Sequence, residues 1–191
     1  MSSSATSLSH ADLVAVSPWV ARFAPLIKPG GRVLDLACGG GRHARYLAAR
    51  GHAVEAADRD AEALARLASV NGISTRQADL EGGPWPYAAG MFDAILVTNY
   101  LHRPLFPLIG AALAVGGVLL YETFARGNES YGKPSNPAFL LAPGELLEAA
   151  GQGGLQVIAY EHGCIEVPKP AVVQRLAAWR APSLAAVAGP L

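Results

Sequence analysis

Residues 33–42 read VLDLACGGGR, and this stretch decides the fold. An apolar run that enters a glycine-rich turn is typical of a buried strand followed by a helix. A second apolar run, residues 53–57, ends at Asp58. Strand, glycine turn, helix, strand and acid in this order predict the α/β unit that holds a nucleoside ribose against a carboxylate. Because glycine adopts positive φ freely and lets a ligand approach the main chain, Gly39 and Gly41 become candidate binding residues.

The acid at the end of the first strand, Asp35, distinguishes between two nucleoside cofactors. Gly39, Gly41 and Ala44 fit the spacing G-x-G-x-x-A of a dinucleotide site. A carboxylate at position 35 lies where a pyrophosphate would pass, and it repels phosphate but attracts the ammonium of a methionine group. Asp35 therefore favours S-adenosylmethionine. The alternative is that Asp35 only accepts hydrogen bonds from turn amides, a common role of aspartate.

Bulk properties describe one compact domain. The chain has 191 residues and zero net charge, with 51% hydrophobic and 16% charged residues, which is typical of a globular protein rather than a disordered one. We expect an N-terminal arm over 1–16, a single domain over 17–181 and a tail over 182–191. The neutral charge and the lack of a basic stripe predict that nucleic acid is not a partner.

Targeting and metal-binding signals are also lacking in the sequence. The serine-rich start has no apolar core of a signal peptide, so we expect a cytoplasmic protein. The most apolar stretch, 104–121, is interrupted by prolines and glycines and is too short to span a membrane. Cys38 and Cys164 lie far apart and lack the spacing of metal ligands, so no metal is expected.

Apolar periodicity and breakers predict alternating strands and helices. We expect helices over about 18–27, 42–50, 60–70, 104–114 and 144–150, and strands over about 32–37, 53–57, 74–77, 92–99, 118–123, 155–162 and 172–179. The alternation predicts a parallel sheet covered on both faces. A helix is the alternative for 172–179, because it contains Ala177-Ala178-Trp179. Residues 124–143 show no periodicity, and we expect a lid or binding loop there.

Nearly all of the chain after Val33 resembles the class I S-adenosylmethionine-dependent methyltransferases. The resemblance rests on the glycine motif at 33–41, the ribose acid Asp58, the adenine-side acid Asp79, the segment Asn99-Tyr100-Leu101-His102 and the glycine turn at 116–117. It implies a three-layer Rossmann-like sheet of seven strands in the order 3-2-1-4-5-7-6, with only strand 7 antiparallel. Within the class, the small size and the opening DLACG look like the tellurite-resistance-type small-molecule methyltransferases.

The resemblance also implies a set of site residues. The expected cofactor-binding residues are Asp35, Ala37, Gly39, Gly41, Asp58, Arg59, Asp79, Leu80 and Asn99. Asp58 would accept hydrogen bonds from the ribose hydroxyls, and Asp79 would receive the adenine amino group. The expected catalytic residues are Tyr100 and His102, which follow the fourth strand. Each of three residues also has a structural alternative without a role in the reaction: Asp58 as a surface acid, Asp79 as a turn-forming residue and His102 as a structural or exposed histidine.

The implied reaction is an in-line displacement at a methyl group on a sulfonium, for which alignment and desolvation supply most of the acceleration. We expect a small-molecule acceptor: a thiol, a chalcogen oxyanion, a hydroxyl or an amine. A soft nucleophile such as sulfur needs no base. An oxygen or nitrogen nucleophile would need His102, Tyr100 or Tyr131 to deprotonate or orient it.

Three other functions fit parts of the sequence. The first is an NAD(P)-dependent oxidoreductase, but no Tyr-x-x-x-Lys pair is evident and the length leaves little room for a substrate domain. The second is a protein that binds the cofactor without turnover. The third is nucleic-acid methylation, which the neutral charge disfavours. In addition, the residues from Asn99 onward lack the Asn-Pro-Pro-Tyr type of tetrad that stacks on a flipped base.

Overall fold

The structure is a computed structural model that describes residues 15–182. Most of the expected N-terminal arm and tail, residues 1–14 and 183–191, lie outside the described residues. Within the described range the strands are β1 (Arg32–Leu36), β2 (Ala53–Asp58), β3 (Ile73–Gln77), β4 (Phe92–Thr98), β5 (Leu113–Phe124), β6 (Gln156–Ile165) and β7 (Ala171–Trp179). The α-helices are α2 (Pro18–Phe23), α3 (Arg42–Ala48), α4 (Ala61–Ala65), α5 (Phe106–Ala112) and α6 (Glu145–Gln152). Short 3₁₀ turns are η1 (Ala24–Leu26), η2 (Arg103–Leu105), η3 (Asn128–Ser130) and η4 (Pro137–Phe139).

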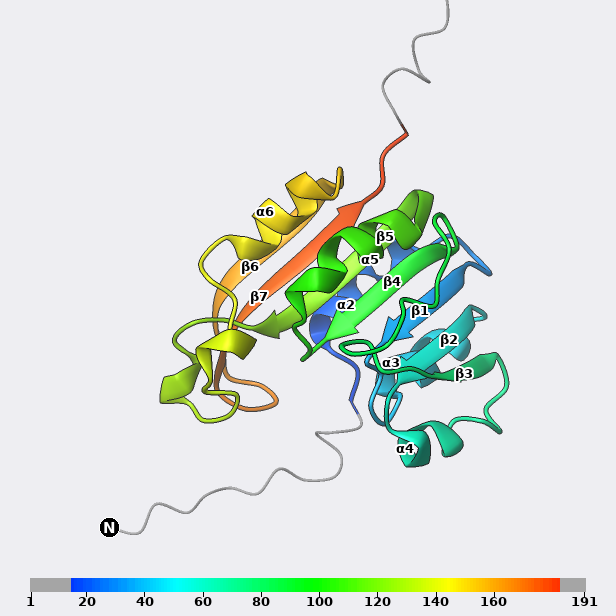
Figure 1. The fold of residues 1–191 in the computed structure, drawn as a ribbon, viewed down its shortest axis with the longest axis horizontal. Coiled ribbons are helices and arrows are strands. Elements are labelled where there is room, and N and C mark those ends of the chain that lie inside the picture. The colour runs from blue at the N-terminus through cyan, green and yellow to red at the C-terminus, as the bar shows by residue number, and fades with distance from the viewer. Residues whose placement is uncertain (1–14, 183–191) are drawn as a thin grey trace, which may run out of the picture.

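The strands form one sheet of order β3-β2-β1-β4-β5-β7-β6 (Figure 1). The pairs β1–β2, β2–β3, β1–β4 and β4–β5 are parallel, whereas β7 runs antiparallel to both β5 and β6. The predicted architecture is therefore confirmed, including the antiparallel seventh strand. The carboxyl ends of β1, β2 and β4 meet at one edge, which is where open α/β sheets bind their ligands.

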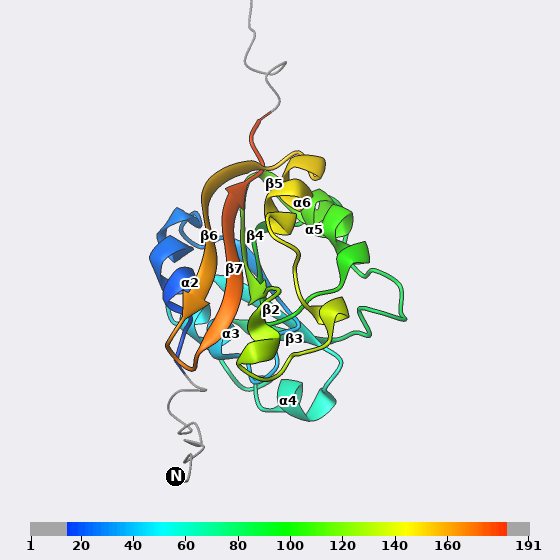
Figure 2. The same cartoon turned by 90° about the vertical axis from the view of Figure 1, so that its left-hand side faces the viewer.

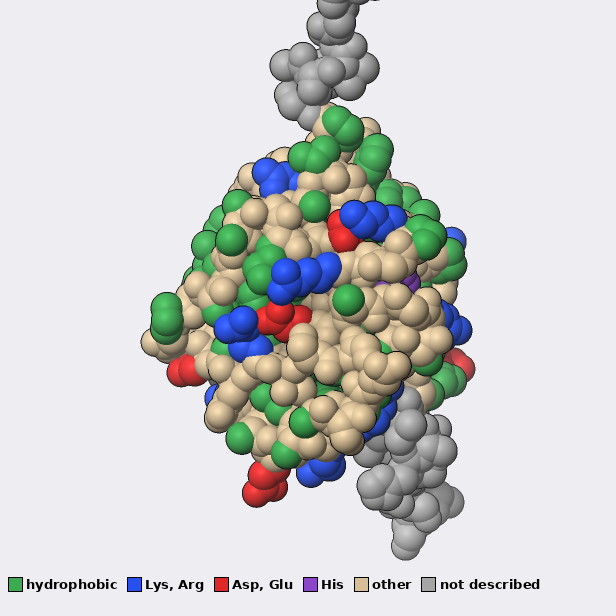
Figure 3. Space-filling model, turned by 90° about the vertical axis from the view of Figure 1, so that its right-hand side faces the viewer, with side chains coloured by type: hydrophobic (Ala, Val, Ile, Leu, Met, Phe, Trp, Pro, Cys, Tyr) green, Lys and Arg blue, Asp and Glu red, His purple; other side chains and the backbone are tan. Residues whose placement is uncertain are grey.

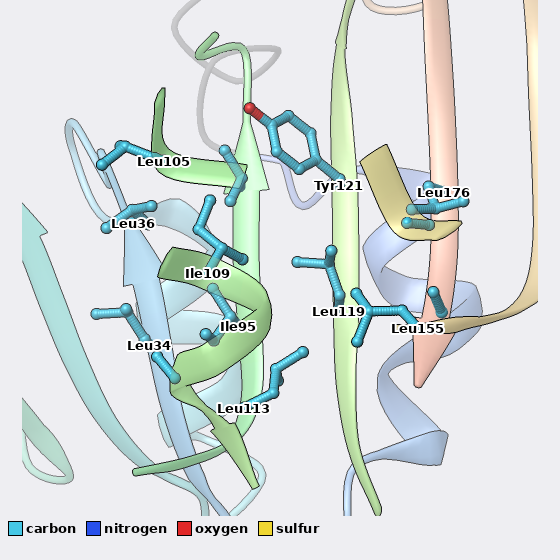
Figure 4. Packing of buried hydrophobic residues seen from close by; sticks show 14 of the residues in the cluster. Leu34, Leu36, Ile95, Leu105, Ile109, Leu113, Leu119, Tyr121, Leu155 and Leu176 are labelled. Atoms are coloured by element: carbon cyan, nitrogen blue, oxygen red, sulfur yellow. The ribbon is translucent and has the colours of Figure 1, made fainter. Parts of the chain in front are cut away.

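Helices cover both faces of the sheet, as the near-continuous apolar strands require (Figure 2). The residues of α2, α3 and α4 bury Trp19, Leu47 and Leu64 on one face. On the other face, α5 and α6 bury Ile109 and Leu146. In Figure 4 leucines and isoleucines of the second face lie on both sides of β5, and the Tyr121 ring projects from β5 toward the side of α5.

The N-terminal helix begins as the sequence predicts. Ser17 is the N-cap, its Oγ accepts the Trp19 amide at 3.1 Å, and Pro18 occupies the first turn. Pro lacks an amide hydrogen and therefore costs nothing at that position. The helix is shorter than the expected 18–27, because its last turn tightens into η1 before Ile27.

Two other boundaries differ from the expected ones for local reasons. The helix expected over 60–70 ends at Ala65, after which the Leu67 amide bonds to Leu64 and the Val70 amide to Leu67 in tight turns. The strand expected over 118–123 starts at Leu113 instead. Its pairing with β4 shifts register between Phe92 and Ala94, so the glycine turn lies within β5 rather than before it.

The C-terminal alternatives are resolved in favour of strands. Residues 171–179 form β7, which is buried on both faces between β5 and β6. Small side chains such as Ala177 and Ala178, both fully buried, allow helices to pack closely on either side. No helix among residues 15–182 is long and apolar enough to cross a membrane.

Candidate active site

A cavity of about 400 Å³ opens at the carboxyl edge of the sheet, within the size range of small-molecule sites. It lies where the segments after β1, β2, β3 and β4 converge. Its lining residues are Ala37, Asp58, Arg59, Ala78, Asp79, Leu80, Glu81, Asn99, Tyr100 and Phe139. Seven residues expected from the sequence thus come together here: Ala37, Asp58, Arg59, Asp79, Leu80, Asn99 and Tyr100.

Asp58 is fixed by two backbone amides. Its Oδ2 accepts the Gly39 amide at 2.8 Å and its Oδ1 accepts the Asp60 amide at 3.0 Å. Each carboxylate oxygen can accept more than one hydrogen bond, so both keep capacity for a ligand hydroxyl. Asp60, not Asp58, caps α4 by accepting the amides of Glu62 and Ala63.

The glycine turn has an open side and a packed side. Gly39 has φ +52°, and a Cβ built on it meets nothing within 4 Å. Gly41 has φ +72° and is buried, and a Cβ there would lie 2.4 Å from Cδ1 of Leu67. Gly39 therefore leaves room above the turn, whereas Gly41 allows α3 to start against Leu67. Gly39 and Gly41 lie outside the lining of the cavity.

Asp35 lies beneath the turn rather than in the cavity wall. Its side chain is buried and its Oδ2 accepts the Ala44 amide at 2.9 Å, which ties the end of β1 to α3. Its Oδ1 is buried without a hydrogen-bond partner among residues 15–182. Burial raises the pKa of Asp35 to about 7, despite the Ala44 bond and the nearby Arg42 charge.

Asp79 lies in the wall that follows β3. Its Oδ1 accepts the amides of Glu81 and Gly82, both at 3.1 Å, and these hydrogen bonds hold the pKa of Asp79 below its usual value. Ala78 and Glu81 flank Asp79 in the wall, and sequence reasoning missed both. Their adjacency to Asp79 was the signal that could have included them.

The segment after β4 is held in a defined conformation. Asn99 has φ +55°, and its amide donates to the Glu122 carbonyl at 2.8 Å. The Tyr121 hydroxyl donates to the Tyr100 carbonyl at 3.0 Å. Burial raises the pKa of the Tyr100 hydroxyl, with a contribution from Glu81, so this group stays protonated near neutrality and can donate a hydrogen bond. His102 lies outside the cavity lining, where it precedes η2.

A buried polar network ties the start of α2 to the site edge. The Ser17 amide donates to Nε2 of His43 at 3.2 Å, and Nδ1 of His43 lies 3.3 Å from Oγ1 of Thr98. Since Nε2 accepts, the ring proton is on Nδ1. Burial lowers the pKa of His43 to about 3, so the ring is neutral. Ser17 Oγ also donates to Glu122, whose Oε2 lies 2.6 Å from Nε of Arg175.

Neither thiol has the environment of a nucleophile or a metal ligand. Burial raises the pKa of the Cys38 thiol, with smaller contributions from Asp35 and Asp58. Cys164 is exposed and lies 3.6 Å from the Tyr131 hydroxyl. No group of three His, Cys, Asp or Glu side chains in the described part of the chain could hold a metal ion.

The geometry at the sheet edge suits the cofactor that the sequence implies. Gly39 leaves the turn open to close approach, and Asp58 is aimed at the cavity by two fixed amides. Asp79 presents a second carboxylate on the β3 side. A nucleoside with a cationic tail can occupy such a site.

Comparison with known proteins agrees with this geometry. Residues 33–114 match a family model described as a methyltransferase domain. Over 77 residues the chain is 37% identical to an uncharacterized methyltransferase of Synechocystis sp., a stretch that makes up 40% of this chain and 36% of that protein. The chain therefore spans little more than a third of that curated relative.

Solved structures share the fold. TehB from Haemophilus influenzae superposes with a TM-score of 0.72 at 24% identity, covering 87% of this chain and 63% of that one. A S-adenosylmethionine dependent methyltransferase from Mesorhizobium loti superposes with a TM-score of 0.70 at 18% identity, covering 87% and 100% of the two chains. At these identities the likeness is one of fold, and it confirms the class I fold expected from the sequence.

Proposed function

We infer that this chain, which carries a methyltransferase domain on the class I S-adenosylmethionine-dependent methyltransferase fold, is a methyltransferase that uses S-adenosylmethionine. We propose that it methylates a small molecule, with a thiol, a chalcogen oxyanion, a hydroxyl or an amine as the acceptor group. In this proposal residues 17–181 act as one catalytic domain.

The charge of the cavity wall carries the proposal. Asp58, Asp79 and Glu81 line it, against a single guanidinium from Arg59. The sulfonium and ammonium of S-adenosylmethionine outweigh its one carboxylate, so an acidic wall attracts it. The pyrophosphate of a dinucleotide carries two negative charges that the same wall repels. The acidic wall thus favours a methyltransferase over an NAD(P)-dependent oxidoreductase.

Three residues of the cavity have separate roles in holding the cofactor. Asp58 accepts the ribose hydroxyls with the lone pairs that Gly39 and Asp60 leave free. Asp79 faces the adenine amino group from the β3 side. Asn99, whose backbone is fixed in the left-handed region, lies on the β4 side near the reacting methyl group.

Asp35 acts from below the turn in this proposal. Its unpartnered Oδ1 receives the ammonium of the methionine group, which gives this buried oxygen the hydrogen bond it lacks. Gly39 keeps the space above the turn free of side-chain atoms. Gly41 contributes indirectly, because it sets the start of α3 against Leu67.

When bound, S-adenosylmethionine supplies a methyl group on a sulfonium: the acceptor's lone pair forms the new bond to carbon while the S–CH₃ bonding pair returns to sulfur. The protein aligns the two partners and excludes water. Tyr100 donates a hydrogen bond and does not act as a base. For a hydroxyl or amine acceptor, His102 takes the proton, and for a thiolate none needs to be taken.

The distribution of surface charge does not favour nucleic acid as a partner. On the face shown in Figure 3, Lys and Arg side chains are intermingled with Asp and Glu rather than gathered into a basic surface. Nucleic-acid-binding proteins depend on such a surface. This distribution supports a small-molecule acceptor.

Formation of S-adenosylhomocysteine tests the function. The purified protein is incubated with S-adenosylmethionine and, separately, thiols, selenite and tellurite, catechols and amines. We expect product above the acceptor-free rate with at least one class, and loss of that product in Asp58→Asn. Tight binding of S-adenosylhomocysteine without turnover on any class would instead make this a binding protein.

A further inference from the structure

A second cavity, a shallow hollow of about 440 Å³ that is open to solvent, shares a side chain with the cofactor cavity and has no role in holding the cofactor. Its lining comprises Phe124, Lys133, Pro134, Ser135, Asn136 and Phe139. Phe139 also lines the cofactor cavity, so one aromatic side chain borders both spaces. Apart from Phe139, the cofactor cavity is lined by the segments at the ends of β1, β2, β3 and β4, whereas the second cavity is lined by the end of β5 and by the segment that joins β5 to α6.

The Phe139 ring is half exposed, at 51%, yet the backbone on either side of it is clamped by Arg103. Nη1 of Arg103 donates to the Ala138 carbonyl at 2.7 Å, and Nη2 donates to the Leu140 carbonyl at 3.0 Å. These are the two residues that flank Phe139. A planar guanidinium can hold two carbonyls in one fixed arrangement, which a lysine ammonium cannot.

Arg103 is itself fixed by Glu145 of α6. Nε of Arg103 donates to Oε1 of Glu145 at 2.5 Å and Nη2 donates to Oε2 at 3.0 Å, a bidentate pair. Oε2 of Glu145 also accepts the Ala142 amide at 2.7 Å. The segment that carries Phe139 is thereby joined to α6 and to the turn after β4.

The other end of this segment is anchored by a buried asparagine. Asn128, 2% exposed, donates through Nδ2 to the Pro134 carbonyl at 2.9 Å and accepts the Val172 amide at 3.2 Å. Asn136 caps η4 by accepting the Ala138 amide at 3.0 Å. Residues 133–139 are therefore a braced wall. An exposed aromatic side chain on a backbone that is already fixed favours binding, because the site loses little conformational entropy when a ligand binds.

We propose that the second cavity binds the methyl acceptor, that Phe139 borders the place where acceptor and cofactor meet, and that Arg103 is a positioning residue that fixes the backbone on either side of Phe139. The acceptor class is a small organic anion: its apolar or aromatic body packs on Phe124, Pro134 and Phe139, and its negative charge faces the Lys133 ammonium. This inference rests on the proposed function and adds to it the acceptor class and the residues that select it.

Binding of a probe anion tests the acceptor class without relying on turnover. The protein is first saturated with S-adenosylhomocysteine, and 4-fluorobenzoate or its neutral match 4-fluorobenzamide is then titrated and followed by ¹⁹F NMR. We expect saturable binding of the benzoate, about fivefold weaker in Lys133→Met and unchanged in Lys169→Met. Lys169 is an exposed lysine outside both cavity linings, so it controls for net charge.

Three results would overturn the acceptor assignment: no saturation by 4-fluorobenzoate up to about 50 mM, equal binding of the benzamide, or equal losses in the two lysine variants. Failure of S-adenosylhomocysteine to bind in the first step would instead overturn the proposed function. The two failures are therefore distinguishable.

A second pair of variants tests the role of Arg103. In Arg103→Met we expect faster hydrogen–deuterium exchange at the amides of Phe139 and Leu140 and at least fivefold weaker 4-fluorobenzoate binding, with partial recovery in Arg103→Lys. The affinity for S-adenosylhomocysteine should change by less than about threefold. Arg22→Met, which removes the exposed ion pair between Arg22 of α2 and Glu161 of β6, should change none of these. Unaltered exchange and probe binding in Arg103→Met would refute the positioning role.

Discussion

The Gly39 amide donates a 2.8 Å hydrogen bond to Oδ2 of Asp58. This bond joins the glycine turn after β1 to the acid that ends β2, two features separated by 19 residues in the chain. The turn and the acid are therefore one unit: the carboxylate is aimed by the same backbone that leaves space for a ligand. Replacing either residue should affect cofactor binding more than folding.

Asp58→Asn should weaken S-adenosylhomocysteine binding. An amide can still accept one backbone bond, but it loses the charge-assisted bonds to the ribose, each worth about 1.5–3 kcal/mol. We expect calorimetry to show at least a tenfold rise in Kd, and a modest fall in the midpoint of thermal unfolding because one of the two backbone hydrogen bonds is lost. Asp60→Asn is the matched control, because asparagine caps a helix as well as aspartate does. A Kd within twofold of the wild type for Asp58→Asn would contradict the ribose role.

Gly39→Val and Gly41→Ala should fail in different ways. A side chain at Gly39 enters open space above the turn, so binding should be lost, and the loss of stability should be limited to the backbone strain of a valine at φ +52°. A Cβ at Gly41 lies 2.4 Å from Leu67 at φ +72°, and strain plus overpacking should cost about 2–4 kcal/mol of unfolding free energy. Urea denaturation and calorimetry on both variants separate the effects. Gly40→Ala is the control, because a Cβ at Gly40 meets open space and its φ is not positive. Equal changes in affinity and in unfolding free energy for all three variants would be inconsistent with this turn geometry.

Asp35 and His43 should make opposite contributions to the pH dependence of stability. The pKa of Asp35 is raised from 3.8 to about 7 in the folded state. Between these two pH values the folded state therefore holds one proton more than the unfolded state, and the unfolding free energy falls as the pH rises. The pKa of His43 is lowered from 6.5 to about 3, so the unfolded state gains a proton below 6.5 and stability falls as pH falls. Between about pH 4 and 6.5 the two slopes, each up to about 1.4 kcal/mol per pH unit, offset one another.

Single variants should reveal each slope. Asp35→Asn retains an acceptor for the Ala44 amide and leaves the His43 contribution, so its unfolding free energy should drop from pH 6.5 toward pH 4.5. His43→Gln leaves the Asp35 contribution, so its unfolding free energy should rise over the same interval. Urea unfolding at several pH values measures both. Slopes of the same sign in the two variants would show that one of these groups titrates normally.

His102→Ala distinguishes acceptor chemistries. Loss of a general base costs about 10²–10⁴ in rate, and only an acceptor that must lose a proton needs one. We expect kcat/KM to fall by that factor with a hydroxyl acceptor and by less than about threefold with a thiolate. Steady-state rates on one acceptor of each kind test this. Equal losses on both would assign His102 a structural role.

The sheet and much of the cavity wall could be predicted because their signals are local. The glycine turn, Asp58 and the runs of β-branched and aliphatic residues each depend on a few neighbouring positions. Their placement at one edge then follows from parallel strand order. The family resemblance assigned Asp79 and Asn99 to the site, and the strand order agrees, since Asn99 comes directly after β4 and Asp79 two residues after β3.

What the sequence did not predict depends on long-range contacts. The Arg103–Glu145 pair joins residues 42 positions apart, and no periodicity marks the segment that carries Phe139. Gly41 has the spacing of a binding glycine, but its packing partner Leu67 comes from a turn after α4 whose position only tertiary structure sets. Asp35 was expected near the ligand, and its burial beneath the turn depends on how α3 closes over β1. The binding roles of Asp35 and Gly41 and the catalytic role of His102 stay predictions.

The most direct test of the central claim is a crystal structure of the protein with S-adenosylhomocysteine. We predict the nucleoside in the cavity between Asp58 and Asp79, with both ribose hydroxyls about 2.5–3.0 Å from the Asp58 carboxylate and the sulfur facing Phe139. Density for the ligand elsewhere, or in this cavity with Asp58 turned away from the ribose, would contradict the account.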